Sequence, residues 1–283
     1  MTDILYAVGI APAKLPHVLA LRAKGAKLAV ILDNVEAARA VAVASRGAPD
    51  ALEALIEIDS DGHRSGVQPD DGLLLEVASA LESGGARLAG VMTHAGSSYN
   101  CTTVEAIRAM AEQERDAAVH SATRLRAAGY ECATVSVGST PTATFARDLT
   151  GVTEVRTGVF VFFDLFMAGL DVCRTDDIAL SVLTTVIGHQ RDKGSAIVDA
   201  GWMAMSRDRG TAKQAVDQGY GLVCDAEGRL IPDVIMVDAN QEHGIIAHRS
   251  GDAARLPDLP VGTLLRVLPN HACATGAQHD RYH

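Results

Sequence analysis

The sequence predicts an α/β protein in which a partial (β/α)8 barrel is followed by a mostly β domain. Through residue 175, short β-branched apolar runs alternate with longer Ala- and Leu-rich stretches of helical period. Polar residues cluster directly after these runs, as they do at the carboxyl ends of barrel strands. From residue 176 the helical period is lost, and short strand-like runs are joined by Gly, Asp and Pro turns. We therefore predict domains at residues 1–175 and 176–283.

Composition and charge exclude several classes of protein. The 283 residues are 48% hydrophobic and 21% charged, which is enough for a large core and excludes global disorder. The net charge of -10, with no Lys/Arg block, argues against a nucleic-acid or membrane-surface partner. We find no signal peptide and no membrane span. Five scattered cysteines indicate a reducing compartment, so we expect a cytoplasmic protein.

Six apolar runs of strand length define the expected sheet of the first domain. They are Asp3–Val8, Lys27–Leu32, Glu53–Asp59, Arg87–His94, Glu131–Val137 and Thr153–Arg156. The stretches of helical period between them are Pro12–Lys24, Val35–Arg46, Asp70–Ser83, Thr103–Ala128 and Thr142–Asp148. A closed barrel of this type needs eight strands and about 250 residues. Either two strands are hidden in the sequence, or the chain begins inside a barrel whose first two units are absent, and we favour the second interpretation.

The second domain is expected to consist of strands connected by turns. The predicted strands are Ala179–Ile187, Ala196–Asp199, Tyr220–Cys224, Val234–Val237, Gly244–His248 and Thr263–Leu268. Little helical period separates them, so we expect a mostly β domain whose strands are joined by Gly, Asp and Pro turns.

Two glycine-containing turns are candidates for binding a phosphate. The fifth run ends at Gly138, where Ser139 and Thr140 precede Pro141 at the expected start of a helix. Glycine lets the backbone approach an anion, and the first turn of a helix offers free N–H groups. The sixth run ends near Gly158, and the last two strands of a barrel often form one phosphate site together. The alternative for the first turn is an ordinary Ser/Thr helix cap.

Three other segments carry candidate functional side chains. Arg64 follows the third run and could fix a carboxylate, a phosphate or a ring nitrogen, although a surface arginine is the simpler interpretation. His94 ends the fourth run and could act as a general base or be structural. His271 and Cys273 stand two residues apart, so an extended segment would direct both to one face, as a half-site that favours Zn²⁺. A buried cysteine beside a polar histidine is the alternative.

Taken together, these motifs resemble the D-serine dehydratase and D-threonine aldolase family of alanine-racemase-like pyridoxal 5'-phosphate (PLP) enzymes. The motifs are Gly-Ser-Thr-Pro-Thr at 138–142, Glu-Val-Arg-Thr-Gly at 154–158 and Pro-Asn-His-Ala-Cys at 269–273. The resemblance covers nearly the whole chain. It implies a barrel that holds PLP, a β domain that contributes a divalent metal (zinc, with Mn²⁺ as the alternative), a small D-amino acid substrate and a homodimer.

The resemblance also implies residue roles. It assigns the metal to His271 and Cys273, and a catalytic role to His94. It places the PLP phosphate at the two glycine turns and Arg64 at the pyridine nitrogen. The residues that would contact PLP are Arg64, Tyr99, Gly138, Ser139, Thr140, Gly158 and Val159. Phe160 departs from the pattern because a tyrosine is usual in that segment. The His-x-Cys form is similar to the zinc-dependent dehydratases, whereas aldolases usually carry His-x-Asp.

The family's Schiff-base lysine has no match in this chain. None of its five lysines stands at the end of an early strand with the expected neighbours. We therefore expect an N-terminally truncated member, with little activity in the 283-residue form. The resemblance implies a lyase that converts a D-3-hydroxy amino acid such as D-serine to a 2-oxo acid and ammonia. The alternatives are retro-aldol cleavage, with His94 taking the hydroxyl proton, and a non-catalytic PLP-fold protein.

Overall fold

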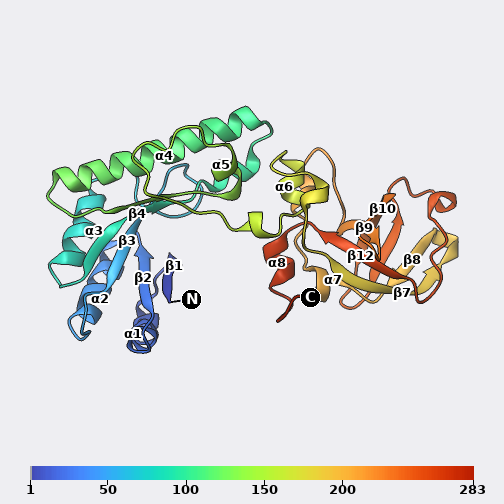
Figure 1. Cartoon of the computed structure of the whole chain (residues 1–283), viewed down its shortest axis with the longest axis horizontal. Helices are drawn as coiled ribbons and strands as arrows, with labels where there is room; N and C mark the ends of the chain where they lie inside the picture. The colour runs from blue at the N-terminus through green and yellow to red at the C-terminus, as the bar shows by residue number, and fades with distance from the viewer. Residues whose placement is uncertain (1) are drawn as a thin grey trace. The chain divides into compact units, whose positions relative to one another are not determined.

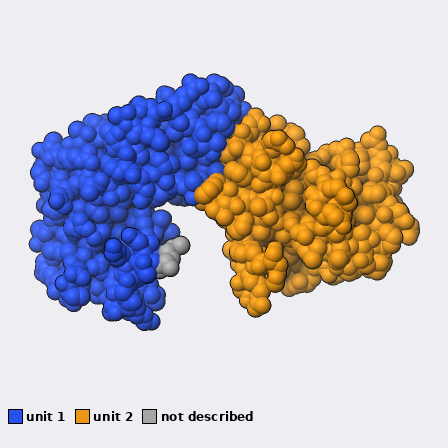
Figure 2. Space-filling model, viewed as in Figure 1, with its two compact units in different colours: residues 1–157 blue, residues 158–283 orange. Residues whose placement is uncertain are grey.

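The computed structural model describes residues 2–283, which form two compact units. Residues 1–157 make up the first unit and residues 158–283 the second (Figure 2). The sequence places the change of composition after residue 175, whereas the compact units divide earlier, and residues 158–175 belong to the second unit. The backbone explains part of this assignment, because Ala179 N donates to Phe162 O at 2.7 Å.

The first unit is built on one parallel sheet whose strands follow one another in chain order. The strands are β1 (Asp3–Gly9), β2 (Lys27–Leu32), β3 (Glu53–Ile58), β4 (Arg87–Thr93), β5 (Thr134–Val137) and β6 (Glu154–Val155). Every neighbouring pair is parallel, with Val30 opposite Ala54 and Ile56 opposite Val91. This arrangement, with strand order equal to chain order, confirms the predicted partial (β/α) barrel.

Helices connect successive strands and cover one face of the sheet (Figure 1). They are α1 (Leu15–Ala23), α2 (Val35–Ser45), α3 (Leu73–Glu82), α4 (Val104–Ala127) and the short α5 (Thr140–Phe145). The main core lies between these helices and the sheet, where Val41, Val77 and Leu88 are fully buried. Ile31 and Leu55 are buried on the opposite face. Burial on both faces explains why the central strands are apolar throughout rather than alternating.

The second unit contains a closed antiparallel barrel with the strand order β10-β11-β8-β7-β12-β9. Its strands are β7 (Val182–Gln190), β8 (Ser195–Val198), β9 (Gly221–Asp225), β10 (Leu230–Ala239), β11 (Gly244–His248) and β12 (Leu264–Pro269). Three short helices accompany it: α6 (Leu165–Gly169), α7 (Trp202–Met205) and α8 (Ala272–Gly276). Val186, Val223 and Met236 lie fully buried in the barrel core. The predicted mostly β domain is thereby confirmed.

The predicted element boundaries differ from the observed ones where turns interrupt the pattern. The fifth strand begins at Thr134 rather than at Glu131. Helix α5 begins at Thr140 rather than at Thr142, because Ser139 caps it and Pro141 occupies its first turn. Strand β7 begins at Val182, three residues after the predicted start. Among the described residues, no helix is long and apolar enough to span a bilayer.

Gly90 provides a test of the contact between β4 and β5. Its φ is +156°, and a Cβ there would lie 1.9 Å from the carbonyl oxygen of Thr134. We expect Gly90→Ala to lower the free energy of unfolding by about 3 kcal/mol or more, because strain adds to overpacking. Gly85→Ala is the matched control, since Gly85 has φ +89° but open space around it. Urea unfolding of both variants measures the difference, and equal losses would contradict the packing argument.

Candidate active site

Two of the predicted site residues, His94 and Gly138, lie where strands β4 and β5 end, next to the end of β6. His94 directly follows β4, Gly138 directly follows β5, and Arg156 directly follows β6. Since all three strands are parallel, their carboxyl ends share one edge of the sheet. That edge is where barrels of this class build their active sites.

The turn after β5 is built for close backbone approach. Gly138 has φ +132°, and a Cβ there would lie 2.1 Å from the carbonyl oxygen of Arg156. Ser139 caps α5: its Oγ accepts from Thr142 N at 3.2 Å, while Ser139 N donates to Thr142 Oγ1 at 3.0 Å. The turn is therefore a capping box, as the helix-cap interpretation of the sequence states, and its role as an anion site stays a prediction.

The ends of β5 and β6 meet through their hydroxyl side chains. Thr140 Oγ1 and Thr157 Oγ1 are 2.9 Å apart, and Arg156 N donates to Val137 O at 2.8 Å. Gly158 follows Thr157 directly in the chain and opens the second unit, where Val159 is buried. The structure thus brings the Gly138 turn and the end of β6 together. The prediction that the turns at Gly138 and Gly158 bind one phosphate requires this contact.

A buried carboxylate, which the sequence analysis missed, joins these segments. Glu114 on α4 is only 2% exposed. Its Oε1 accepts from Ala95 N at 2.8 Å and from Gly138 N at 3.0 Å, and its Oε2 accepts from Thr142 Oγ1 at 2.7 Å. Burial raises the pKa of Glu114, and these hydrogen bonds oppose the rise. All three partners donate, so the geometry matches the ionised carboxylate.

The ring of His94 is held in one tautomer. Its Nδ1 lies 3.1 Å from Gly138 O, and because a carbonyl only accepts, Nδ1 carries the proton. Nε2 of the neutral ring is then the basic nitrogen. Burial is the main cause that lowers the pKa of His94 below its ordinary value. The hydrogen bond to Gly138 opposes burial, and the nearby charges of Arg64 and Arg156 add to it. A half-buried, neutral imidazole at a strand end is suited to general-base work.

Arg64 and Tyr99 lie close to His94. Arg64 is exposed, and its positive charge contributes to the lowered pKa of His94. The loop that carries it is tied down because Asp61 Oδ2 accepts from Ser97 N at 2.7 Å. The Tyr99 ring centroid is 6.1 Å from that of His94. The assignment of Arg64 to a pyridine nitrogen stays a prediction.

Arg156 forms a second link across the strand ends that the sequence analysis did not single out as functional. Its Nε donates to Ser136 Oγ at 2.7 Å, and its Nη2 donates to Thr93 O. Burial lowers the pKa of its guanidinium, and the neighbouring carboxylates of Glu114 and Glu154 counteract that effect. The guanidinium therefore connects β6 with β5 and β4 at the same edge.

In the second unit, His271 and Cys273 lie together, although not in the expected extended segment. His271 is the N-cap residue of α8, and Cys273 stands within its first turn. A hydrogen bond with Cys273 is the largest of the causes that raise the pKa of His271 to about 9. Asp208 Oδ2 lies 2.6 Å from His271 Nδ1, and Asp164 Oδ2 accepts from Ala272 N at 2.8 Å. Two carboxylates therefore fix this loop.

The donor set of this loop fits a divalent metal of borderline softness. Asp208 occupies Nδ1 of His271, which leaves Nε2 for a cation, and a histidine whose second nitrogen meets a carboxylate is the usual arrangement of a metal ligand. Cys273 is exposed, and its sulfur is the second candidate ligand. No cluster of three or more His, Cys, Asp or Glu side chains suited to a metal occurs within residues 2–283. The metal-ligand roles of His271 and Cys273 therefore stay predictions.

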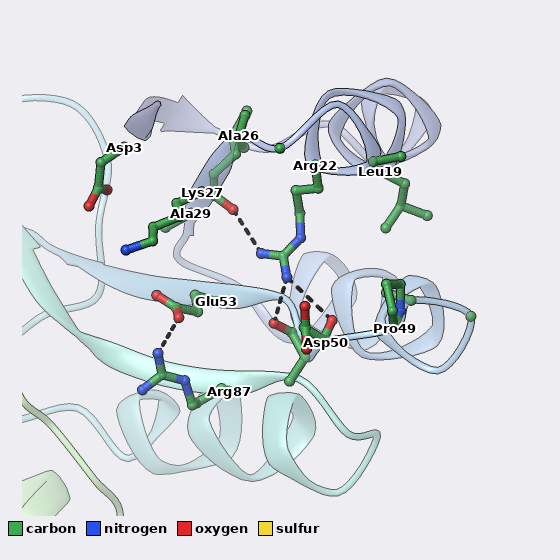
Figure 3. A pocket seen from close by; sticks show the side chains of 16 residues that line it. Asp3, Leu19, Arg22, Ala26, Lys27, Ala29, Pro49, Asp50, Glu53 and Arg87 are labelled. Atoms are coloured by element: carbon green, nitrogen blue, oxygen red, sulfur yellow. Dashed lines mark hydrogen bonds and ion pairs between the residues drawn. The ribbon is translucent and has the colours of Figure 1, made fainter. Parts of the chain in front are cut away.

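A pocket of about 790 Å³ lies at the opposite edge of the sheet (Figure 3). Lys27, Glu53 and Arg87, which begin β2, β3 and β4, contribute to its wall. Glu53 and Arg87 form an ion pair, and Arg22 donates to backbone carbonyls of the loop before β3. None of the predicted site residues lines this pocket.

Comparison with known proteins assigns the family. The alanine racemase N-terminal domain family matches residues 3–165, and the serine dehydratase domain family matches residues 179–283. The chain is 60% identical, over 99% of its length, to D-threo-3-hydroxyaspartate dehydratase of Delftia sp. (strain HT23), of which it covers 75%. The chain belongs to the D-serine dehydratase and D-threonine aldolase family of fold type III PLP enzymes.

Two further relatives show the breadth of this family. D-threonine aldolase of Arthrobacter sp. is 30% identical over 96% of the chain, which covers 67% of that protein. Among solved structures, a cysteine-to-alanine mutant of D-threo-3-hydroxyaspartate dehydratase in the metal-free form superposes with a TM-score of 0.97 at 59% identity. The superposition covers 100% of this chain and 75% of the mutant dehydratase chain. Family members therefore include both dehydratases and aldolases.

Among the residues that the sequence analysis missed, Glu114 could have been identified from the sequence, whereas Asp208 could not. Glu114 falls on the buried stripe of α4, with Ile107 and Ala111 before it and Ala118 after it. An acidic residue on an apolar helix face signals a buried partner, so the helical period could have identified it. Asp208 lies in a loop and left no periodic signal.

The lowered pKa of His94 provides a measurable prediction. In histidine-selective NMR, we expect His94 to titrate with a midpoint below 6.5, because burial disfavours its charged form. The neutral base form then persists through pH 7 and is lost only as the pH falls through that lowered pKa. Arg64→Gln should raise the midpoint, since it removes a positive charge, whereas Arg22→Gln at the opposite edge should not. A midpoint above 6.5 in the unmodified protein would contradict the assignment.

Proposed function

We propose that this protein is a PLP- and metal-dependent lyase that eliminates water from a D-3-hydroxy amino acid and yields a 2-oxo acid and ammonia. The match at 60% identity along 99% of the chain to a D-threo-3-hydroxyaspartate dehydratase carries the proposal. The Gly138 turn, His94 and the His271–Cys273 pair all fall within this matched length. D-serine and D-threo-3-hydroxyaspartate are the proposed substrates.

The first unit supplies the proposed cofactor contacts. The hydroxyl groups of Ser139 and Thr140 and the backbone N–H of Thr140 would hold the PLP phosphate, and Gly138 lets the chain turn there. The family resemblance gives the backbone of Gly158 and Val159 the same role. Arg64 would face the ring nitrogen, and Tyr99 would border the ring. When bound, PLP acts as an electron sink for the carbon that carries the amino group. The Thr140–Thr157 contact supports this placement, since it brings hydroxyls from two strand ends to one point.

The second unit supplies the proposed metal site. His271 and Cys273 would hold a divalent cation, and their nitrogen and sulfur donors favour zinc, with Mn²⁺ as the alternative. When bound, the metal polarises the β-hydroxyl group of the substrate. Asp208 fixes the ring of His271, and Asp164 holds the backbone between the two ligands. One solved relative is a cysteine-to-alanine mutant in the metal-free form, which agrees with a thiolate ligand.

Retro-aldol cleavage is the second candidate function. The Arthrobacter relative is a D-threonine aldolase, and the neutral His94 would take the β-hydroxyl proton through Nε2. The cysteine at 273 favours the dehydratase, because the family's aldolases usually carry an aspartate there. The two reactions differ in the bond that breaks: carbon–oxygen in the elimination and carbon–carbon in the aldol cleavage.

Product analysis decides between these reactions. We expect a form of the protein that includes the family's Schiff-base lysine, when supplied with PLP and zinc, to release equal amounts of 2-oxo acid and ammonia from D-serine or D-threo-3-hydroxyaspartate. Glycine and an aldehyde from D-threonine would identify the aldolase instead. His94→Asn should impair the aldolase reaction by on the order of 10²–10⁴ in rate, as loss of a general base does. Absence of both product pairs would contradict the proposed lyase.

Asp208 provides a test of the metal site that does not need turnover. We expect Asp208→Asn to lower the affinity for zinc by about 10–100-fold, because the amide holds the His271 ring less firmly than the carboxylate does. Calorimetric titration of the metal-stripped protein measures the change. Asp217→Asn is a control, since Asp217 pairs with Arg209 rather than with His271. Unchanged zinc affinity in Asp208→Asn would show that this carboxylate does not support a metal ligand.

A further inference from the structure

Glu114 stands out as a buried acidic side chain to which the proposed chemistry gives no direct role. It is 2% exposed, and it lies on the face of α4 that packs against the sheet. A carboxylate in such a place is costly unless its lone pairs are used. Here both oxygens are engaged, by three donors from two separate segments: Ala95 after β4, and the turn from Gly138 to Thr142 after β5.

The three donors belong to residues whose positions determine the geometry of the site. Ala95 N belongs to the residue after His94, and Gly138 N to the residue whose carbonyl accepts from the His94 ring. Thr142 closes the capping box of the hydroxyl-rich turn. One carboxylate therefore sets the backbone on both sides of the His94–Gly138 hydrogen bond and anchors the turn itself.

We propose that Glu114 is a positioning residue that fixes the His94 tautomer and the phosphate turn at the same time. This inference rests on the proposed function for the identity of the anion, the PLP phosphate. The hydrogen bonds of Glu114 and the His94 tautomer do not depend on that function. Glu114 does not reach the substrate or the cofactor in this scheme. It acts through the backbone of Gly138, whose N–H donates a hydrogen bond to Glu114 and whose C=O accepts a hydrogen bond from Nδ1–H of His94.

Two substitutions separate hydrogen bonding from bulk and charge. Glu114→Gln keeps the shape and an oxygen that can accept from Ala95 N and Gly138 N, whereas Glu114→Ala leaves both N–H groups buried without this partner. Glu112→Ala is the matched control, because Glu112 is exposed on the same helix. Should Glu114→Ala fail to fold, Glu114→Asp takes its place, since the shorter side chain cannot reach all three donors.

The first measurement concerns His94 alone. Long-range ¹H–¹⁵N spectra of the histidine rings, with the His94 signal assigned by its loss in His94→Asn, report which nitrogen carries the proton. We expect Nδ1–H in the unmodified protein, in Glu114→Gln and in Glu112→Ala. We expect a mixture of tautomers in Glu114→Ala or Glu114→Asp. A single Nδ1–H tautomer in both of these last variants would overturn the proposal.

The second measurement concerns the turn. Equilibrium dialysis with PLP and with pyridoxal, which lacks the phosphate, separates phosphate contacts from ring contacts. We expect Glu114→Ala to weaken PLP binding by about 10-fold, the effect expected when buried donors lose their acceptor. Pyridoxal binding should change by less than about 3-fold. Equal losses for Gln and Ala at this position would show that charge, and not positioning, is responsible.

The two measurements keep this inference distinct from the proposed lyase. A tautomer change in Glu114→Ala, in a protein that releases neither product pair, would support the positioning role and contradict the proposed function. Lyase activity that survives Glu114→Ala, with an unchanged tautomer and unchanged PLP affinity, would support the proposed function and contradict the positioning role.

Discussion

The hydrogen bonds of one buried carboxylate hold the functional edge of the first unit together. Glu114 links the ends of β4 and β5 with the start of α5, and each of its donors is a group that would be costly to bury without a partner, at roughly 1–3 kcal/mol each. Removing this acceptor would free the backbone at Gly138, where the turn and the His94 ring meet. The geometry of the edge therefore depends on a residue of the covering helix rather than on the strands alone.

Opposite charges surround this edge from two sides. The guanidinium of Arg156 reaches Ser136 and the carbonyl of Thr93, and its charge favours the ionised form of Glu114. Burial is the main cause that lowers the pKa of His94, and the positive charges of Arg64 and Arg156 add to it. An edge with buried charges of both signs around a neutral histidine is suited to a base that works near neutral pH. The fold and the electrostatics thus both favour a general base at this edge.

The second unit solves a similar positioning problem with different elements. A closed barrel leaves few free edges, and its last strand, β12, leads directly into the loop with His271 and Cys273. Asp208 and Asp164, which come from distant parts of the same unit, fix the ring and the backbone of this loop. In both units, then, short polar loops at strand ends are made rigid by carboxylates that do not themselves lie in the loop.

The sequence by itself determined the fold class, the strands of the parallel sheet and the local turns. Hydrophobic period and capping chemistry depend on neighbours along the chain, so Lys27–Leu32 and the turn after Gly138 could be predicted with nearly correct bounds. Only the tertiary structure decided the partners of the buried polar groups. Glu114 is 24 residues from Gly138, and Asp208 is 63 residues from His271, so packing rather than local pattern brings them together. The same packing placed His271 and Cys273 at the start of a helix, where the sequence had suggested an extended segment.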